Sequence, residues 1–591
     1  MAMRPAVDLP QRIRNAKAGY QPLDAEQLAL ARQEVERAMG ALERALHEHP
    51  KAQQWKQFLL WDVLEGELAA GREPDPARLR NVRQQFVTDH PGFELAPFTD
   101  LRAALGEYAV ALEDAANPNA RHDFETHLDA LAAAVEACRT EPRQSLRAEI
   151  ARHLGWLQQH RQASDVVDAT RQAFSHPNVL ARLPQPVAAR WLSEEIKSSG
   201  PVRDVVLGSQ IRGTEQTVGA VAPVLVPDER RAVVQMELTA TSRARTVGVN
   251  GPVRVYQNND VTLQGRKQIV LDRDGIRTLP AQSTANVASQ LTGIDTVLQR
   301  PLVECLVLRQ ACRRVNRQQD QADCIAEGRQ RQRLNEQLDR DVDARIAEAS
   351  ARLNDKFFHP LTRYDIPPRS FRAETSHTEL HVSLEVAAAD QLGAADEPPV
   401  VGNDPDTALI HVHASAIENY AAATVAGKTY TAQQLSDMLG NYAGNANRSN
   451  GRDAVDDVSV TLDYEKPITL RSESGSLVLT VHGRRYISRK RAYPPMNITV
   501  RYRLAVSDGT VRMTLEGDPE IVPPRFADSE TKRLSGREAT LRRMLLAQLD
   551  RQLPKTIALN QLADPARNTA AVSATIAKLV AENNWLTVVF R

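Results

Sequence analysis

The chain has 591 residues, of which 42% are hydrophobic and 25% are charged, and its 74 basic side chains are matched by 74 acidic ones. This composition is typical of a folded globular protein of roughly two to four domains and excludes wholesale disorder. The zero net charge gives no global electrostatic preference for nucleic acid or for an anionic membrane, so we expect no nucleic-acid partner.

The first third of the sequence has a helical pattern. Residues 1–20 are expected to form a flexible tail, and residues 21–199 a helical domain. Apolar residues recur at helical spacing from about Asp24 to Glu48, and Asp24 is a suitable N-cap. A second predicted helix carries Trp55, Phe58 and Leu68 and stops at Gly71. Further helices are predicted over about 76–88, 98–116, 120–139, 142–160 and 163–175. Short Pro, Gly or Asn breaks join them, which is typical of a bundle or a short superhelical array.

Strand patterns replace the helical period in residues 200–285. Apolar and polar side chains alternate over residues 234–238, as in a half-buried strand. The dipeptides Asn250-Gly251 and Asp274-Gly275 favour tight hairpin turns. This segment is therefore predicted to be an antiparallel β region.

Residues 286–356 are predicted to form a helical hairpin that turns at about 313–323. Cys312 and Cys324 flank the turn and are disulfide candidates, because the two thiols would meet across the base of the hairpin. Such a bond would stabilise the fold by roughly 3 kcal/mol through loop closure. The alternative is that the cysteines are reduced and buried.

The remainder of the chain is predicted to be a second antiparallel β region, residues 357–530, followed by a C-terminal helix and a terminal strand, residues 531–591. Alternation is regular over 380–386 and 496–504, where one face of each strand is apolar. The predicted fold class is α+β and multidomain: an N-terminal helical bundle or array, then antiparallel sheets packed around a long helical hairpin.

Four histidines are the candidate metal ligands. They fall in strand patterns, and the two members of each pair share one face: His377 with His381, and His411 with His413. Imidazoles gathered on a sheet suit zinc or copper, so a metal-dependent hydrolase is one hypothesis; solvated surface histidines are the alternative. The sequence has no nucleophile elbow and no dinucleotide fingerprint, so the chain is expected not to be an enzyme and no cofactor is predicted.

A basic cluster lies in the second β region. Its members could grip phosphates of nucleic acid or of lipid headgroups. A charged hairpin tip that protects a sheet edge is the alternative, and the one we favour. The cluster consists of Arg484, Arg485, Arg489, Lys490 and Arg491.

Two resemblances add to this interpretation. The stretches VVLGSQIRGTEQTVG (205–219), NGPVRVY (250–256), HVHASAIENYAAATVAGKTYT (411–431) and YPPMNITVRYRL (493–504) resemble a family of uncharacterised bacterial proteins of planctomycete type. That resemblance implies an envelope-associated protein and brings no catalytic residues. The order of long sheets and helices is also similar to that of tubular lipid-binding (TULIP-type) domains, in which a sheet wraps an apolar helix.

Together these patterns predict a non-enzymatic binding or scaffold protein of the bacterial envelope that holds a lipid or another apolar ligand between sheet and helix. The alternative is an adaptor that docks a protein partner on its helical domain. No stretch approaches the roughly 18 consecutive apolar residues that span a bilayer, and the first twenty residues lack a signal-peptide core. We therefore expect a periplasmic or envelope location if a signal segment is missing from the chain, and a cytoplasmic one otherwise.

Overall fold

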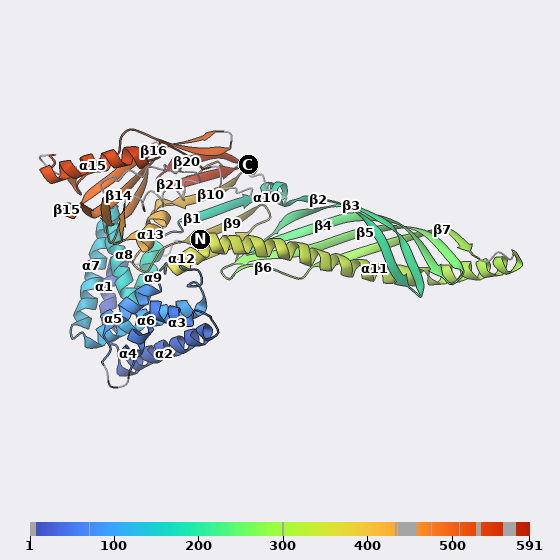
Figure 1. Cartoon of the computed structure of the whole chain (residues 1–591), viewed down its shortest axis with the longest axis horizontal. Helices are drawn as coiled ribbons and strands as arrows, with labels where there is room; N and C mark the ends of the chain where they lie inside the picture. The colour runs from blue at the N-terminus through green and yellow to red at the C-terminus, as the bar shows by residue number, and fades with distance from the viewer. Residues whose placement is uncertain are drawn as a thin grey trace.

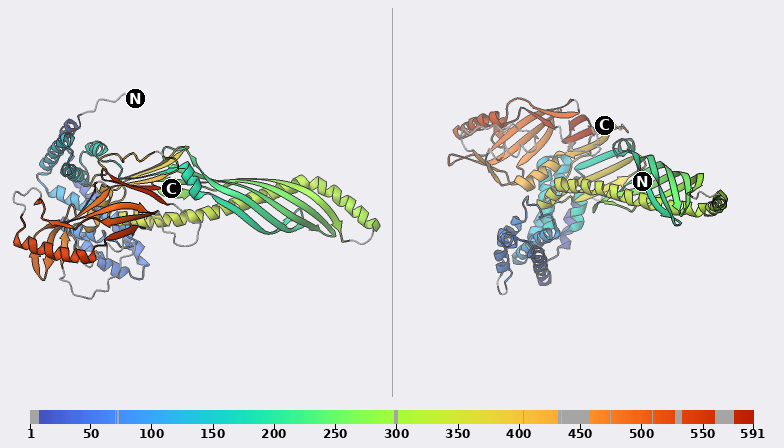
Figure 2. Two further views of the ribbon diagram at one scale, coloured as in Figure 1. Left: turned by 90° about the horizontal axis from the view of Figure 1, so that it is seen from above. Right: turned by 45° about the vertical axis from the view of Figure 1, so that its right-hand side comes forward.

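A computed structural model describes the chain from residue 8 to residue 591, apart from 70, 72, 298–300, 403, 432–433, 435–457, 474, 508, 527–532 and 560–574. Figure 1 shows a helical domain, a body made of two sheets, and a long arm in which extended strands run beside one helix. The views in Figure 2 confirm that the arm projects away from both other parts. The predicted α+β fold with antiparallel sheets is confirmed.

The sequence predicted the first long helix of the helical domain, α2, closely. Asp24 caps α2, and its side chain accepts a hydrogen bond from the backbone of Gln27 in a capping box. Two clusters of buried apolar side chains hold the domain together. Its helices are α1 (Leu9–Asn15), α2 (Ala25–His47), α3 (Ala52–Phe58), α4 (Trp61–Glu67), α5 (Pro76–Gln85), α6 (Ala96–Ala116), α7 (Ala120–Thr140), α8 (Gln144–Gln159) and α9 (Ser164–Phe174).

Two expectations for this part of the chain are wrong. Residues 8–20 are not a loose tail: α1 buries Leu9 and Ile13 in the same core as α7 and α8. Residues 179–184 are not helical but form the strand β1 (Val179–Pro184), followed by α10 (Gln185–Leu192). β1 adopts this form because it is hydrogen-bonded on both sides within a sheet, and such pairing overrides local helix propensity.

One sheet of the body joins distant parts of the sequence. Its antiparallel order is β20-β21-β10-β1-β9-β8, so β1 from the N-terminal third lies between strands from the C-terminal half. The strands are β8 (Ser370–Thr375), β9 (Glu379–Glu385), β10 (Ala408–His413), β20 (Ile576–Glu582) and β21 (Trp585–Phe590). β21 confirms the predicted terminal strand.

The second sheet of the body has nine strands in the described residues. Helix α15 (Gly536–Gln552) packs Leu541 and Leu545 against its apolar face, and α13 (Ala414–Val425) contributes Ala421 and Val425 to the same core. The strands are β11 (Thr429–Thr431), β12 (Ser459–Leu462), β13 (Ile468–Glu473), β14 (Ser476–Ser488), β15 (Arg491–Tyr493), β16 (Met496–Ser507), β17 (Thr510–Leu515), β18 (Glu520–Val522) and β19 (Thr556–Leu559). The sequence also predicts a loop over residues 440–457, which lie outside the described residues.

The arm consists of a six-stranded antiparallel sheet curled against one helix, α11 (Pro301–Leu353). Its longest strands have 18 to 20 residues, which corresponds to about 60 Å of extended chain. The order is β2-β3-β4-β5-β6, with β7 paired to the distal part of β5. The strands are β2 (Glu194–Val206), β3 (Ser209–Val226), β4 (Ala232–Asn250), β5 (Val253–Asp272), β6 (Gly275–Thr278) and β7 (Gln282–Thr296).

The predicted helical hairpin is wrong, because α11 is a single helix of 53 residues. The expected turn at 313–323 contains no Gly or Pro and is rich in Arg and Gln, so nothing in it ends a helix. The strand region also extends further than expected, since β7 ends at Thr296. Cys312 and Cys324 therefore lie on one helix, about 18 Å apart along its axis, and both are exposed free thiols. A disulfide between them is excluded by that separation.

Candidate ligand groove between the arm sheet and α11

The inner face of the arm sheet is the face that α11 covers. Nearest the body, this face is closed by close packing: Leu334 and Leu338 of α11 lie in one buried cluster with Leu238 and Leu263 of the sheet. All four side chains are less than one-tenth exposed. We call this segment the plug, because it fills the space between sheet and helix.

A glycine permits the close approach of helix and sheet in the plug. Gly265 of β5 faces α11, and a Cβ placed on it would lie only 2.7 Å from Cδ1 of Leu338. A larger residue would push the helix side chain away from the sheet. The plug therefore has no space for a ligand.

A buried ion pair fastens the plug on its body side. The ammonium of Lys267 lies 2.5 Å from Oδ1 of Asp339 and 2.8 Å from Oδ1 of Asp343, and the lysine side chain is 1% exposed. Asp339 also accepts a hydrogen bond from the backbone N–H of Ala281, and Asp343 accepts one from Thr278. Burial by itself would lower the pKa of Lys267. The hydrogen bonds and charges of the two aspartates raise the pKa by more, so its net shift is upward.

Beyond the plug, the inner face becomes polar. Ser242 donates a hydrogen bond to Glu215 and accepts one from Thr217, which joins β3 to β4. On the other edge, Ser289 of β7 donates to Asp323 of α11 at 2.6 Å. We call this segment the polar band. The pair formed by Ser289 and Asp323 holds the helix at the sheet edge, and in the centre of the sheet Ser242 and Thr246 are buried.

Toward the far end of the arm, the inner face is apolar again but open. The cross-strand register places Ile211, Gly248, Val255 and Ile294 side by side on four neighbouring strands, and Leu291 precedes them on β7. None of these side chains is buried. A Cβ added to Gly248 would meet nothing closer than 3.9 Å, whereas one added to Gly265 would clash. The inner face is thus closed at Gly265 and open at Gly248, while Val206 and Thr296 at the two edges of its distal end are buried.

Helix α11 presents a matching apolar stripe. Counting back from Ala326, which packs in the plug, residues at helical spacing reach Leu308, Ala311 and Val315. All three are only half-buried. We call the distal inner face of the sheet, taken together with this stripe, the distal groove.

The apolar faces that the sequence indicated as ligand walls are core instead. Leu384 in 380–386 packs beneath α12 (His359–Arg363), and Met496 in 496–504 packs beneath α15. The sequence contained a partial signal for this sheet, because the alternation over residues 234–238 identified β4. What it lacked was the position of the helix along that face.

The candidate histidines do not form a metal site. His411 and His413 are buried on β10, where Nδ1 of His411 lies 2.8 Å from Oγ1 of Thr587. Burial lowers the pKa of both rings, that of His413 to about 4. His381 lies on β9, with β1 between it and β10, and its Nε2 is 2.9 Å from Glu379; His377 is exposed in the preceding turn. Within the described part of the chain, no three His, Cys, Asp or Glu side chains are arranged to hold a metal ion.

The basic cluster lies on and beside the β14–β15 hairpin. Arg489 and Lys490 occupy its two-residue turn in left-handed conformation. The guanidinium of Arg484 lies over the ring of Tyr464 at 4.7 Å, a cation–π contact. Arg485 and Arg491 are exposed, as the charged-tip interpretation requires.

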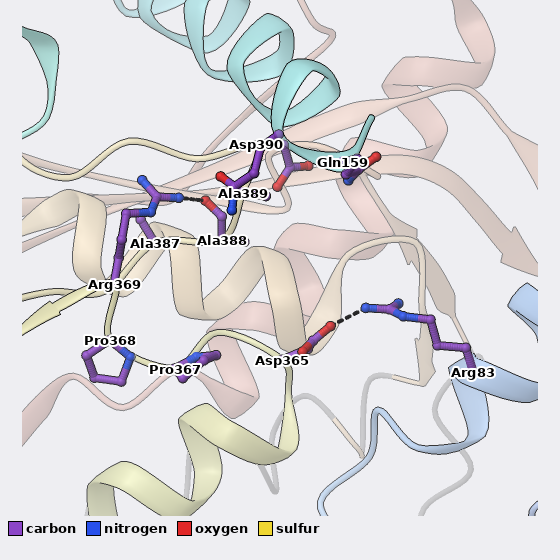
Figure 3. Close-up of a pocket in the computed structure, with 11 residues that line it drawn as sticks. Arg83, Gln159, Asp365, Pro367, Pro368, Arg369, Ala387, Ala388, Ala389 and Asp390 are labelled. Carbon is purple, nitrogen blue, oxygen red and sulfur yellow. Dashed lines mark hydrogen bonds and ion pairs between the residues drawn. The ribbon is translucent and has the colours of Figure 1, made fainter. Parts of the chain in front are cut away.

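A polar pocket of about 440 Å³ lies where the helical domain meets the body (Figure 3). Arg83 of α5 is ion-paired with Asp365, and Arg369 donates to the carbonyl of Ala388. Both guanidiniums are therefore already bound to protein acceptors. The pocket is a junction that ties α5 to the segment leading into β8, and we assign it no ligand.

A stacked aromatic array in the helical domain was not anticipated from the sequence. The ring of Trp156 lies between His127 and His160, with centroid distances of 4.0 Å on each side. Nδ1 of His127 is 2.9 Å from Nδ1 of His153, and Nδ1 of His160 is 2.6 Å from Oδ1 of Asp114. Burial, followed by the neighbouring histidines, lowers the pKa of His127 to about 4. The rings come from α7 and α8, so only the packing of these helices reveals the array.

Comparison with known proteins gives distant structural similarities. The crystal structure of lipopolysaccharide binding protein aligns with 70% of this chain and 98% of its own, at 10% identity and a TM-score of 0.28. The structure of P47 from Clostridium botulinum A2 aligns with 71% of this chain and 99% of its own, at 8% identity and a TM-score of 0.19. No family model and no curated protein matches the chain, so no family is assigned and the planctomycete-type resemblance stays a prediction. In the described residues, no helix is both long enough and apolar enough to cross a membrane.

Proposed function

We propose that this protein is a non-enzymatic binding protein that holds an apolar chain, such as the acyl chain of a lipid, in the distal groove. The observation that carries the proposal is the contrast between Gly265 and Gly248. Both glycines lie on the inner face of the sheet. A Cβ added to Gly265 would clash with Leu338 of α11, whereas a Cβ added to Gly248 would lie in open space. Apolar side chains left half-exposed along an open groove favour an apolar occupant.

The dimensions of the groove suit a long chain. From the polar band at Asn259 to the end of β5 at Val253 the strand covers six residues, or about 20 Å. The plug closes the groove toward the body, so a ligand would enter from the distal end. The polar band at the inner end offers Glu215 and Asn259 as hydrogen-bonding partners, so an amphipathic ligand with a polar terminus is also accommodated.

A binding role is favoured over a catalytic one by the chemistry of the lining. Ile211, Val255 and Ile294 are aliphatic, and aliphatic side chains hold a ligand by excluding water without supplying an acid, a base or a nucleophile. Asp204, which ends their row on β2, is already ion-paired with Arg329 and Arg333 of α11. An envelope location is part of the same proposal, because membranes are the source of such ligands. Fractionation of the native cell tests this part, and recovery of the protein only with cytoplasmic markers would contradict it.

Native mass spectrometry with organic extraction of the purified protein tests the ligand. We expect a bound species that is lost on unfolding and recovered as a lipid in the extract. The matched variants are Gly248→Leu, which fills the groove, and Gly293→Leu, which adds the same bulk on the outer face beside Tyr256. Occupancy should fall at least tenfold in the first variant and stay at the wild-type level in the second. A bare chain that also fails to take up added fatty acid would refute the proposal.

A further inference from the structure

The outer face of the arm sheet carries an unusual set of side chains at its distal end. Two adjacent rows of the cross-strand register contain, in strand order, Val205, Gln210, Val249, Arg254 and Asp295, and then Arg203, Arg212, Val247, Tyr256 and Gly293. Arg245 follows in the next row. We call this set the distal outer face. It lies at the end of the arm furthest from the body (Figures 1 and 2).

Apolar side chains on this face are exposed to water. Val205 is 56% exposed, Val249 37% and Tyr256 36%. They come from β2, β4 and β5, so the exposure is shared by three strands and is not the result of one frayed end. Single exposed apolar residues are common on protein surfaces, but a group of them in adjacent rows marks an interaction surface.

The charges on this face are unbalanced. Arg203 and Arg212 stand directly opposite each other on neighbouring strands, an arrangement of like charges that destabilises a sheet. Asp295, opposite Arg254, is the single acidic residue in the three rows. The described residues offer no carboxylate within ion-pair distance of Arg203, Arg212 or Arg245. An external anion would relieve the repulsion that the sheet itself leaves in place.

We propose that the distal outer face docks on the surface of an anionic lipid bilayer. Arginines that flank exposed valines and a tyrosine match the layered chemistry of that surface: guanidiniums bind lipid phosphates, a tyrosine ring lies at the headgroup level, and aliphatic side chains enter the boundary beneath. A nucleic acid would use the arginines but would gain nothing from the exposed valines, so a bilayer accounts for more of the face. This inference is independent of a ligand in the distal groove.

Vesicle flotation with the full chain tests the inference. Vesicles of phosphatidylcholine alone are compared with vesicles in which about one third of the lipid is phosphatidylserine. The wild-type protein should bind the anionic vesicles and not the neutral ones, and binding should weaken as salt rises. Since each arginine near an anionic surface contributes about a fivefold change in affinity, Arg203→Gln with Arg212→Gln should weaken binding about 25-fold. Val205→Ser with Tyr256→Ser should weaken it without changing the salt dependence.

The matched control is Arg44→Gln with Arg152→Gln, which removes two exposed arginines from the helical domain and should leave vesicle binding unchanged. Circular dichroism confirms that each variant is folded. Equal binding to neutral and anionic vesicles, or equal losses in the arm and control variants, would overturn the inference. Binding to a duplex oligonucleotide without binding to vesicles would also overturn it and would assign the face to a nucleic acid. Gly248→Leu should bind vesicles normally, so failure of the groove proposal is distinguishable from failure of this one.

Discussion

Replacing Lys267 with methionine should loosen the arm at the plug. The lysine ammonium is buried between Asp339 and Asp343, and methionine preserves most of the side-chain volume while removing the charge. Breaking a fully buried ion pair costs about 3–5 kcal/mol, mainly because the remaining charge is left without a partner. Here the remaining charges are carboxylates that are 37% and 50% exposed, so water compensates in part. We therefore expect a loss of about 2 kcal/mol of local stability.

Hydrogen exchange followed by mass spectrometry is the appropriate assay, because a chain of several parts has no single free energy of unfolding. Peptides from β5, β6 and the middle of α11 should exchange about 30-fold faster in Lys267→Met, which corresponds to about 2 kcal/mol. Peptides of the helical domain should be unchanged. Lys197→Met is the control, because Lys197 forms its ion pair with Glu195 on the exposed surface of β2.

A compensating variant separates charge from packing. Changing Asp339 and Asp343 to asparagine together with Lys267→Met removes the unpaired carboxylates but keeps the oxygens that accept hydrogen bonds from Ala281 and Thr278. Exchange should return to within about fivefold of the wild-type rate, since a neutral replacement of a buried pair is often tolerated. If the single variant exchanges at the wild-type rate, or if the triple variant is no better than the single one, the reasoning is wrong.

The pH range of the effect follows from the pKa shifts. The pKa of Lys267 is raised above 10.5, so its contribution is present below that value and is lost as the pH rises through the folded-state pKa. The pKa of Asp343 is lowered below 3.8 by Lys267 and then by Thr278, so its contribution is present above 3.8 and is lost in acid. The difference between wild type and Lys267→Met should therefore be constant between these two limits.

Two further predictions concern the helical domain and the cysteines. The pKa of His127 falls from 6.5 to about 4 on folding, so the unfolded chain binds more protons in that range and the helical domain should lose stability as the pH drops from 6.5 toward 4. The loss of stability should be about 2 kcal/mol after allowance for the water that reaches the half-buried ring. Melting curves at several pH values should show this loss in the wild type but not in the variant His127→Gln with His153→Gln. Equal pH dependence of the two proteins would contradict the assignment of the effect to His127. Under native conditions Cys312 and Cys324 should react with a thiol reagent at once and Cys138 only on unfolding, because the first two are exposed and the third is buried; protection of the α11 pair that a reductant removes would show that the helix is not continuous there.

The sequence determined the local elements of this protein to a large extent. Periodicity placed α2 and α5 to α9 within a few residues of their observed bounds, because each buries one apolar stripe and all but α8 are followed by a Pro, Gly or Asn break. Alternation over residues 234–238 and the two turn dipeptides identified the central strands of the arm, and alternation over 496–504 identified β16. A half-buried strand needs no knowledge of its partner to show its period. The C-terminal strand was equally clear.

Only the tertiary structure decided how these elements combine. β1 is a strand because β9 and β10, some 200 residues later, pair with both its edges, and no local pattern contains that information. The turn expected at 313–323 does not form, because a charged segment without Gly or Pro continues as a helix when a sheet supports it. The candidate groove illustrates the same limit. The sequence indicated a sheet in this region but placed most of β7 in a helix, and the distance of α11 from the inner face, which closes the plug at Gly265 and leaves Gly248 open, depends on how two elements pack together in space.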